Sequence, residues 1–242
     1  LFQFTPFKEY QTYFNVYAIW VASQDSFLVD VDWGEEPRTY FGWPYGDERA
    51  SFALRNLLPA VNSIVTVMLV NDDKMTAGGS KGSMTIGTGR FHHDPDITEV
   101  VYIQSVRHEF GHALGGLSDE YEGLQTFDAE KGRSFINVTT ETNRDRIRWK
   151  HWIEPTVPVP TPATDFYPEQ KPSTSAYANQ VGLFEGAYLY SKGWYRPKLS
   201  CMMRGSSSGG DFGPPPFCEV CREALVLEIY RQVDPTADID LE

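Results

Sequence analysis

The stretch HEFGHALGGLSDEY, residues 108–121, decides how this chain is interpreted. It opens with an HExxH pattern, in which His108 and His112 flank Glu109. Apolar side chains recur at helical spacing around the motif, and Gly115-Gly116 ends that pattern. Asp94, Asp96 and Thr98 precede it as a signature of a helix start, so we expect a helix across the motif. Residues four apart on a helix face the same way. Both imidazoles can therefore reach one zinc ion at about 2.0–2.1 Å.

Glu109 predicts what such a zinc ion would do. Its carboxylate lies beside the first histidine ligand, where it can contact a zinc-bound water. Zinc lowers the pKa of that water towards about 7, and the carboxylate can take its proton during attack on a carbonyl group. The motif therefore predicts a catalytic Zn2+ held by His108 and His112, with Glu109 as the general base.

A third protein ligand is expected, because open catalytic zinc sites combine three protein ligands with one water. In the metzincin pattern HExxHxxGxxH, a glycine turns the chain back towards the metal and a third histidine follows. Gly115 stands at the glycine position, but Ser118 stands where that histidine would be and is a poor zinc ligand. Since Gly116 can accommodate a shift of one residue, we predict Asp119 as the third ligand, with Glu120 as the alternative.

Composition and charge exclude several function classes. The chain has 242 residues, 41% of them hydrophobic, which is ordinary for a globular protein. Its 21 basic and 33 acidic residues give a net charge of −12, whereas a nucleic-acid binder normally has the opposite balance. The longest apolar run, residues 64–70, is too short to span a membrane. We expect a monomer that acts on a protein or peptide substrate.

The rest of the chain predicts an α/β protein. Subdomain 1–116 should carry a sheet and the HExxH helix, and subdomain 117–242 the third ligand and a C-terminal helix, together forming one catalytic domain. Proline-rich residues 133–190 should be largely irregular. The remaining expected elements follow from periodicity and composition: strands at 14–21 and 63–70, helices at 49–60 and 218–233, and a glycine-rich edge strand within 78–87, where another backbone approaches closely.

Three cysteines lie near the C-terminus, at positions 201, 218 and 221. A zinc ribbon would need a second CxxC or CxxH pair, which the chain lacks. We therefore expect one disulfide, between Cys201 and either Cys218 or Cys221, and one remaining thiol; the alternative is three reduced cysteines.

Two features suggest an exported protein. Residues 137–139, Asn-Val-Thr, form a glycosylation sequon. The chain begins with Leu1 and contains no signal-like segment, so any targeting segment would lie outside these residues. We expect a secreted protein.

The motif stretch 108–121 resembles the active site of the IgA-peptidase family, which are secreted, metzincin-like zinc peptidases. Further segments of the chain are similar to that family, and together they cover most of it: FNVYAIWVASQDS (14–26), VMLVND (67–72), GLFEGA (182–187), YSKGWYRP (190–197), CMMR (201–204) and FCEVC (217–221).

The resemblance implies a metzincin-like zinc peptidase, with a mixed twisted sheet and an active-site helix above an irregular, partly helical C-terminal subdomain. Its substrate cleft would lie between the two subdomains. His108 and His112 would be zinc ligands and Glu109 the general base. Met203 would be the Met-turn residue beneath the zinc, although Met202 competes for that role. No residue is assigned to stabilise the transition state.

The predicted activity is zinc-dependent hydrolysis of internal peptide bonds in protein substrates. The rival is a catalytically silent, zinc-bearing module of the same fold that binds proteins or glycans. The intact Glu109 argues against this rival, because a dead enzyme would be expected to lose that residue first.

Overall fold

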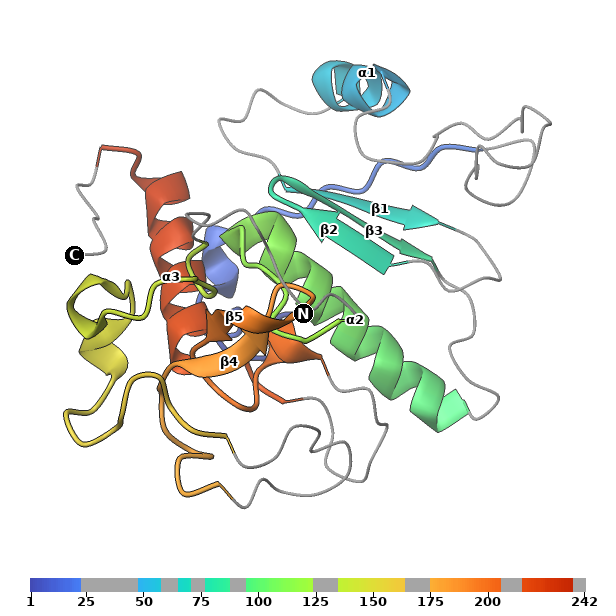
Figure 1. Ribbon diagram of the computed structural model, residues 1–242. Coiled ribbons are helices and arrows are strands. Elements are labelled where there is room, and N and C mark those ends of the chain that lie inside the picture. Colours follow the sequence, from blue (N-terminus) through green and yellow to red (C-terminus); the bar gives the residue numbers. More distant parts are fainter. Residues whose placement is uncertain are drawn as a thin grey trace. The chain divides into compact units, whose positions relative to one another are not determined.

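The computed structural model describes residues 1–22, 48–57, 65–70, 77–87, 95–123, 135–163, 175–205 and 215–236. These residues form two compact units, each with its own secondary structure. The N-terminal unit comprises Tyr10–Leu114, and the C-terminal unit comprises Leu1–Glu9 together with Gly115–Glu242. Both helices and strands occur, which confirms an α/β composition (Figure 1).

A three-stranded mixed sheet is the centre of the N-terminal unit, in the order β1-β3-β2. Strand β1 (Thr66–Val70) is rich in β-branched residues and pairs in parallel with β3 (Ser83–Gly87). Strand β2 (Ala77–Ser80) pairs antiparallel with β3 and forms one edge of this sheet. The glycine-rich segment thus supplies an edge strand, as its composition predicted.

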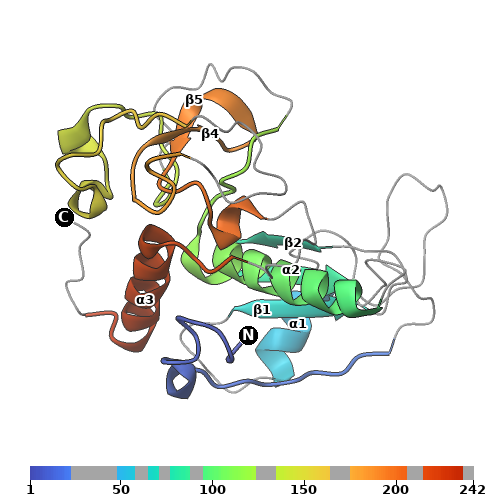
Figure 2. The same cartoon turned by 90° about the horizontal axis from the view of Figure 1, so that it is seen from below.

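Two helices lie on opposite sides of this sheet, as Figures 1 and 2 show. Helix α1 spans Glu48–Leu57, where a helix over 49–60 was expected, and residues 58–60 lie outside the described part of the chain. Helix α2 spans Pro95–Gly115 and carries the HExxH motif. The helix begins within the start signature formed by Asp94, Asp96 and Thr98, and it ends at the glycine pair as predicted.

The expected buried strand at 14–21 is wrong. A short 3-10 helix, η1 (Gln11–Tyr13), precedes the segment, and residues 14–21 form no strand. Val16 and Trp20 are 78% and 86% exposed. The apolar run favours a strand, but no described strand pairs with it, and most of its side chains stay exposed.

The C-terminal unit contains a hairpin and a helix. Strands β4 (Phe184–Ala187) and β5 (Tyr190–Arg196) pair antiparallel. Helix α3 spans Glu219–Val233, as its apolar periodicity predicted, and Cys218 is its N-cap. The described parts of the connecting segments are mostly irregular, as expected. They hold three short 3-10 helices: η3 (Arg144–Arg146), η4 (Lys150–Trp152) and η5 (Met202–Arg204).

Large apolar side chains fill the core of the C-terminal unit. Trp149 and Trp194 are 1% and 0% exposed, and the Trp149 indole N–H donates to the Gly182 carbonyl oxygen over 2.9 Å. The first residues of the chain join this core, since the rings of Phe7 and Phe217 meet edge to face with centroids 6.0 Å apart.

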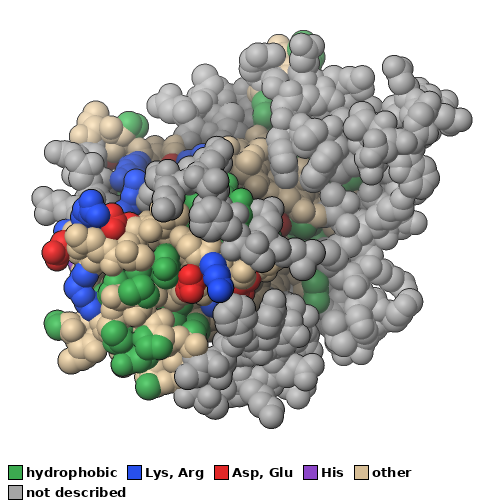
Figure 3. All heavy atoms as spheres, viewed as in Figure 1, with side chains coloured by type: hydrophobic (Ala, Val, Ile, Leu, Met, Phe, Trp, Pro, Cys, Tyr) green, Lys and Arg blue, Asp and Glu red, His purple; other side chains and the backbone are tan. Residues whose placement is uncertain are grey.

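Within the described residues, no helix is both long and apolar enough to cross a membrane. On the face drawn in Figure 3, acidic and basic side chains lie close together. Two pairs of oppositely charged side chains in the C-terminal unit form ion pairs: Lys198 Nζ lies 2.6 Å from Glu219 Oε1, and Arg146 Nε lies 3.0 Å from Glu141 Oε2.

Candidate metal centre

Helix α2 brings the two motif histidines together. Their Nε2 atoms lie 3.1 Å apart, and their rings are nearly perpendicular, at 85°. Two nitrogens at this separation, each about 2.0–2.1 Å from a shared zinc ion, would subtend roughly 100° at the metal, close to a tetrahedral angle. Both rings are half-buried, so solvent can reach the site. The donor pair therefore fits a zinc ion with open positions.

Gly79 of β2 packs directly against the helix at this point. A Cβ atom at Gly79 would lie 2.6 Å from the Glu109 backbone oxygen, 3.0 Å from Glu109 Oε2 and 3.1 Å from His112 Cβ. No other residue fits there without a shift of the backbone. The edge strand and the Glu109 carboxylate are thus neighbours, which is the close backbone approach that the glycines predicted.

The end of α2 is fixed by the β2–β3 turn. Lys81 Nζ donates to the Leu114 carbonyl oxygen, and the Gly82 N–H donates to the Ala113 carbonyl oxygen over 2.8 Å. These donors satisfy carbonyl groups that the helix end leaves free, and the lysine charge suits the negative end of the helix. Gly116, with φ of 62°, then turns the chain in a conformation that favours glycine.

Asp119 follows four residues after the last residue of α2. Asp119 belongs to the C-terminal unit and the two histidines to the N-terminal unit, so its role as the third ligand stays a prediction. Its backbone is held in place from the β4–β5 turn, since the Tyr188 N–H donates to the Asp119 carbonyl oxygen over 3.0 Å. The side chain is half-buried, like the two histidines.

Glu120, the alternative third ligand, has different surroundings. It is fully buried, and its Oε1 atom accepts from Asn137 Nδ2 at 3.0 Å and from Cys221 Sγ at 3.0 Å. Burial raises the pKa of the Glu120 carboxyl group well above its ordinary value, and the negative charge of a Cys201 thiolate would raise it further. Its potential metal-ligand neighbours are the three cysteines.

Residues 1–173 and 168–229 match the family described as IgA Peptidase M64. The chain belongs to the IgA peptidase M64 family. This confirms the family that the HEFGHALGGLSDEY stretch resembles, and it makes the chain a member of a peptidase family. A comparison with curated proteins found no match.

Met202 and Met203 lie in η5 of this M64-family chain, and both are completely buried. The carbonyl oxygen of Met203 accepts from the Glu120 N–H over 2.8 Å, so its backbone lies beside the segment that carries Asp119. A polarizable thioether can pack against such a segment without ligating a metal. The assignment of Met203 rather than Met202 as the Met-turn residue stays a prediction.

The disulfide expected from the sequence is wrong, because all three cysteines are free and buried. Cys201 Sγ and Cys221 Sγ lie 3.7 Å apart, far beyond the disulfide bond length of about 2.05 Å. Hydrogen bonds among the three cysteines favour ionisation of the Cys218 thiol. Although burial disfavours a thiolate at Cys218, hydrogen bonds from Cys201 and Cys221 lower the pKa of Cys218 to about 6.

The sequon is not available for glycosylation in the folded chain. Asn137 is 0% exposed, and its side chain accepts from the Ser118 N–H and donates to the Ser118 carbonyl oxygen, both over 2.8 Å. Asn137 thus holds the backbone next to Asp119, a structural role that the sequon obscured. Its contacts join segments 17 to 19 residues apart, which no local pattern encodes.

Proposed function

We propose that this chain is a metzincin-like, zinc-dependent endopeptidase that hydrolyses internal peptide bonds of protein substrates. The pair of Nε2 atoms 3.1 Å apart on α2, with a glutamate between the two histidines, is the observation that carries the proposal. Membership of a peptidase family supports it. No observation favours the rival reading of a silent binding module.

His108, His112 and Asp119 would hold the metal, the histidines through Nε2 and the aspartate through a carboxylate oxygen. Only three residues separate Gly115, the last residue of α2, from Asp119. Because an extended chain advances at most about 3.3–3.6 Å per residue, Asp119 must lie near the end of this helix. When bound, zinc supplies a Lewis acid that polarises the substrate carbonyl and makes water a nucleophile at neutral pH.

Glu109 would move the proton. Its carboxylate would accept a proton from the attacking water at one Oε atom, and would then pass that proton to the nitrogen of the leaving amine. Contact with the Gly79 backbone limits where this carboxylate can lie. A carboxylate held in one place is better suited to such a transfer than one that samples several rotamers.

Strand β2 would bind the substrate. It is an edge strand of the described sheet and lies against Glu109 through Gly79. An extended peptide can add to such an edge through backbone hydrogen bonds. This geometry would bring a substrate peptide bond close to the proposed general base.

Secretion and a monomeric state remain predictions. The sequon lends secretion no support, because Asn137 is buried. The three reduced cysteines give no support either, because they form no disulfide of the kind common in exported proteins.

The test is cleavage of a mixed peptide library by the parent and by Glu109→Gln, with new termini identified by mass spectrometry. We expect the parent to cleave internal bonds, and the variant to lose about 10²–10⁴-fold in rate while keeping its metal. Glu99→Gln is the matched control, because Glu99 lies on the same helix and is exposed. This control should cleave like the parent.

Equal cleavage by parent and Glu109→Gln would overturn the mechanism. If the parent binds one metal ion at the histidine pair and cleaves nothing, a binding module would be the better description. A parent without metal at the histidine pair would overturn the proposal at its first step.

A further inference from the structure

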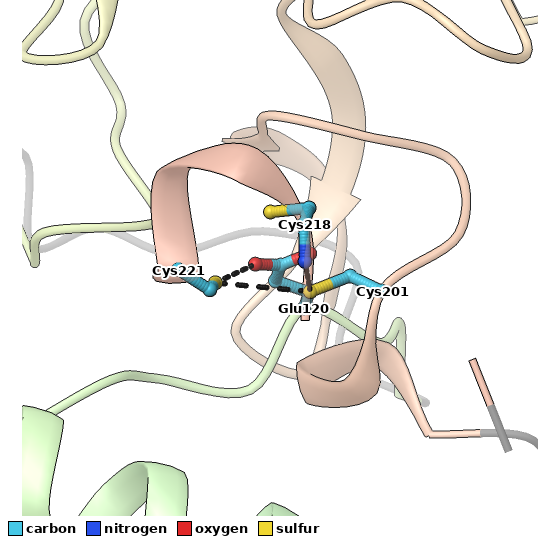
Figure 4. A group of neighbouring side chains, drawn as sticks. All are labelled: Glu120, Cys201, Cys218 and Cys221. Atoms are coloured by element: carbon cyan, nitrogen blue, oxygen red, sulfur yellow. Dashed lines mark hydrogen bonds between the residues drawn. The ribbon is translucent and has the colours of Figure 1, made fainter. Parts of the chain in front are cut away.

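A second group of potential metal ligands lies within the C-terminal unit. We call Glu120, Cys201, Cys218 and Cys221 the Glu120–cysteine cluster (Figure 4). One ligand atom from each residue lies within 4.8 Å of all the others. The four side chains are between 0% and 4% exposed, so the cluster is closed to solvent.

Three separate segments supply these ligands. Glu120 follows α2, Cys201 precedes η5, and Cys218 and Cys221 lie at the start of α3. The last two form a CxxC pair, a spacing that recurs in structural zinc sites. Figure 4 shows the carboxylate and the three thiol groups converging from these segments.

The spacing of the sulfur atoms suits a metal better than a disulfide. Cys201 Sγ and Cys221 Sγ are 3.7 Å apart. Two thiolates about 2.3 Å from one tetrahedral zinc ion would be separated by roughly 3.8 Å, whereas a disulfide requires about 2.05 Å. The Cys218 N–H donates to Cys201 Sγ over 3.3 Å, the kind of backbone contact that supports a metal-bound thiolate.

The carboxylate provides a second, independent observation. Glu120 Oε1 accepts from Asn137 Nδ2 and Cys221 Sγ, but Oε2 is buried and has no hydrogen-bond partner. An unsatisfied, fully buried carboxylate oxygen costs free energy unless a ligand meets it. A divalent cation among the three sulfur atoms would satisfy it.

We propose that Glu120, Cys201, Cys218 and Cys221 bind a structural zinc ion, in addition to the metal proposed at His108 and His112. Four protein ligands complete a tetrahedron and leave no position for water or substrate, so this ion would have no catalytic role. It would tie the Asp119-bearing segment to α3 and to η5. The inference does not depend on peptidase activity.

Metal content of the full chain tests the proposal. We compare the parent, a His108→Ala/His112→Ala variant and a Cys218→Ser/Cys221→Ser variant after dialysis, by elemental analysis. We expect two zinc ions per chain in the parent and one in each variant. One ion in the parent together with an unchanged content in the cysteine variant would overturn the proposal.

A spectroscopic measurement covers the case in which the cysteine variant fails to fold. In the His108→Ala/His112→Ala variant, X-ray absorption at the zinc edge should give three sulfur neighbours at about 2.3 Å and one lighter ligand. Nitrogen and oxygen neighbours alone, or a disulfide seen as a loss of two hydrogens in the unreduced parent, would overturn the proposal.

These experiments separate the two metal proposals. A zinc ion with sulfur ligands, in a parent that holds nothing at the histidine pair, would support the structural site and reject the peptidase mechanism. The reverse result, one ion lost only in the histidine variant, would reject the structural site alone.

Discussion

The backbone N–H of Glu120 donates to the carbonyl oxygen of Met203 over 2.8 Å. This bond ties the segment after α2 to the buried methionine pair of η5. The next residue of the segment is also held by a backbone hydrogen bond, in which the Tyr121 carbonyl oxygen accepts from the Leu189 N–H over 3.1 Å. The segment that carries Asp119 is thus hydrogen-bonded to two other parts of the C-terminal unit, which is the support that Asp119 would need as the proposed ligand.

The identity of the third ligand is the first prediction. Asp119→Asn should lower metal affinity at the histidine pair and peptidase activity by more than about 100-fold, because an amide is a weaker zinc ligand than a carboxylate. Glu120→Gln is the paired variant, and it should keep the histidine-bound metal. Titration with zinc and a competing chelator measures both. The opposite pattern would make Glu120 the third ligand.

Gly79 gives the second prediction. Gly79→Ala places a methyl group 2.6 Å from the Glu109 backbone oxygen, so β2 or α2 must shift. We expect a loss of stability of about 1–3 kcal/mol, typical of overpacking, together with reduced kcat/KM. Ser80→Ala, at the exposed next position of β2, is the control and should behave like the parent. Denaturant unfolding and peptide cleavage measure the two effects.

If Gly79→Ala is as stable and active as the parent, the contact between β2 and Glu109 does not constrain the general base. A variant that is destabilised but fully active would show that the contact serves folding alone.

A buried ion pair gives the third prediction. Arg196 Nη1 lies 2.8 Å from Glu122 Oε1, with side-chain exposures of 2% and 8%. Glu122→Gln leaves the arginine charge buried without its partner, which should cost about 3–5 kcal/mol in the free energy of unfolding. Glu141→Gln, which alters the exposed pair with Arg146, should have little effect. If both variants lose the same free energy of unfolding, burial is not what makes the Arg196–Glu122 pair important for stability.

Helices were the part of the fold that the sequence predicted well. In α2 and α3, apolar periodicity and terminal signals act within a few residues, so both ends could be placed. His108, Glu109 and His112 could be predicted as site residues for the same reason, because one helical turn sets their spacing.

The β4–β5 hairpin was missed because its turn carries no turn residues. Tyr188 and Leu189 have positive φ values of 53° and 67°, a conformation usually taken by glycine or asparagine. Contacts with another segment hold the turn instead, since the Tyr188 N–H donates to the Asp119 carbonyl oxygen and the Leu189 N–H to the Tyr121 carbonyl oxygen. Glu120 was likewise missed as a partner of the cysteines, because Cys221 lies 101 residues further along the chain.

The final prediction concerns pH and the start of α3. Lys198 Nζ lies 2.6 and 2.8 Å from the two carboxylate oxygens of Glu219, the first residue of that helix. Although partial burial opposes ionisation, the hydrogen bond from Lys198 and one from the backbone N–H of Glu219 lower the pKa of this carboxyl group below 4.5.

A carboxyl group whose pKa is lowered by folding stabilises the folded state above its unfolded pKa, and this stability is lost as pH falls through the folded pKa. Glu219→Gln should therefore lose less than about 1 kcal/mol at pH 7, because solvent screens this partly exposed pair. The gap to the parent should close as pH falls below about 4.5. Urea unfolding at several pH values measures the gap. A gap that stays constant down to acid pH would show that the carboxylate charge contributes nothing at this position.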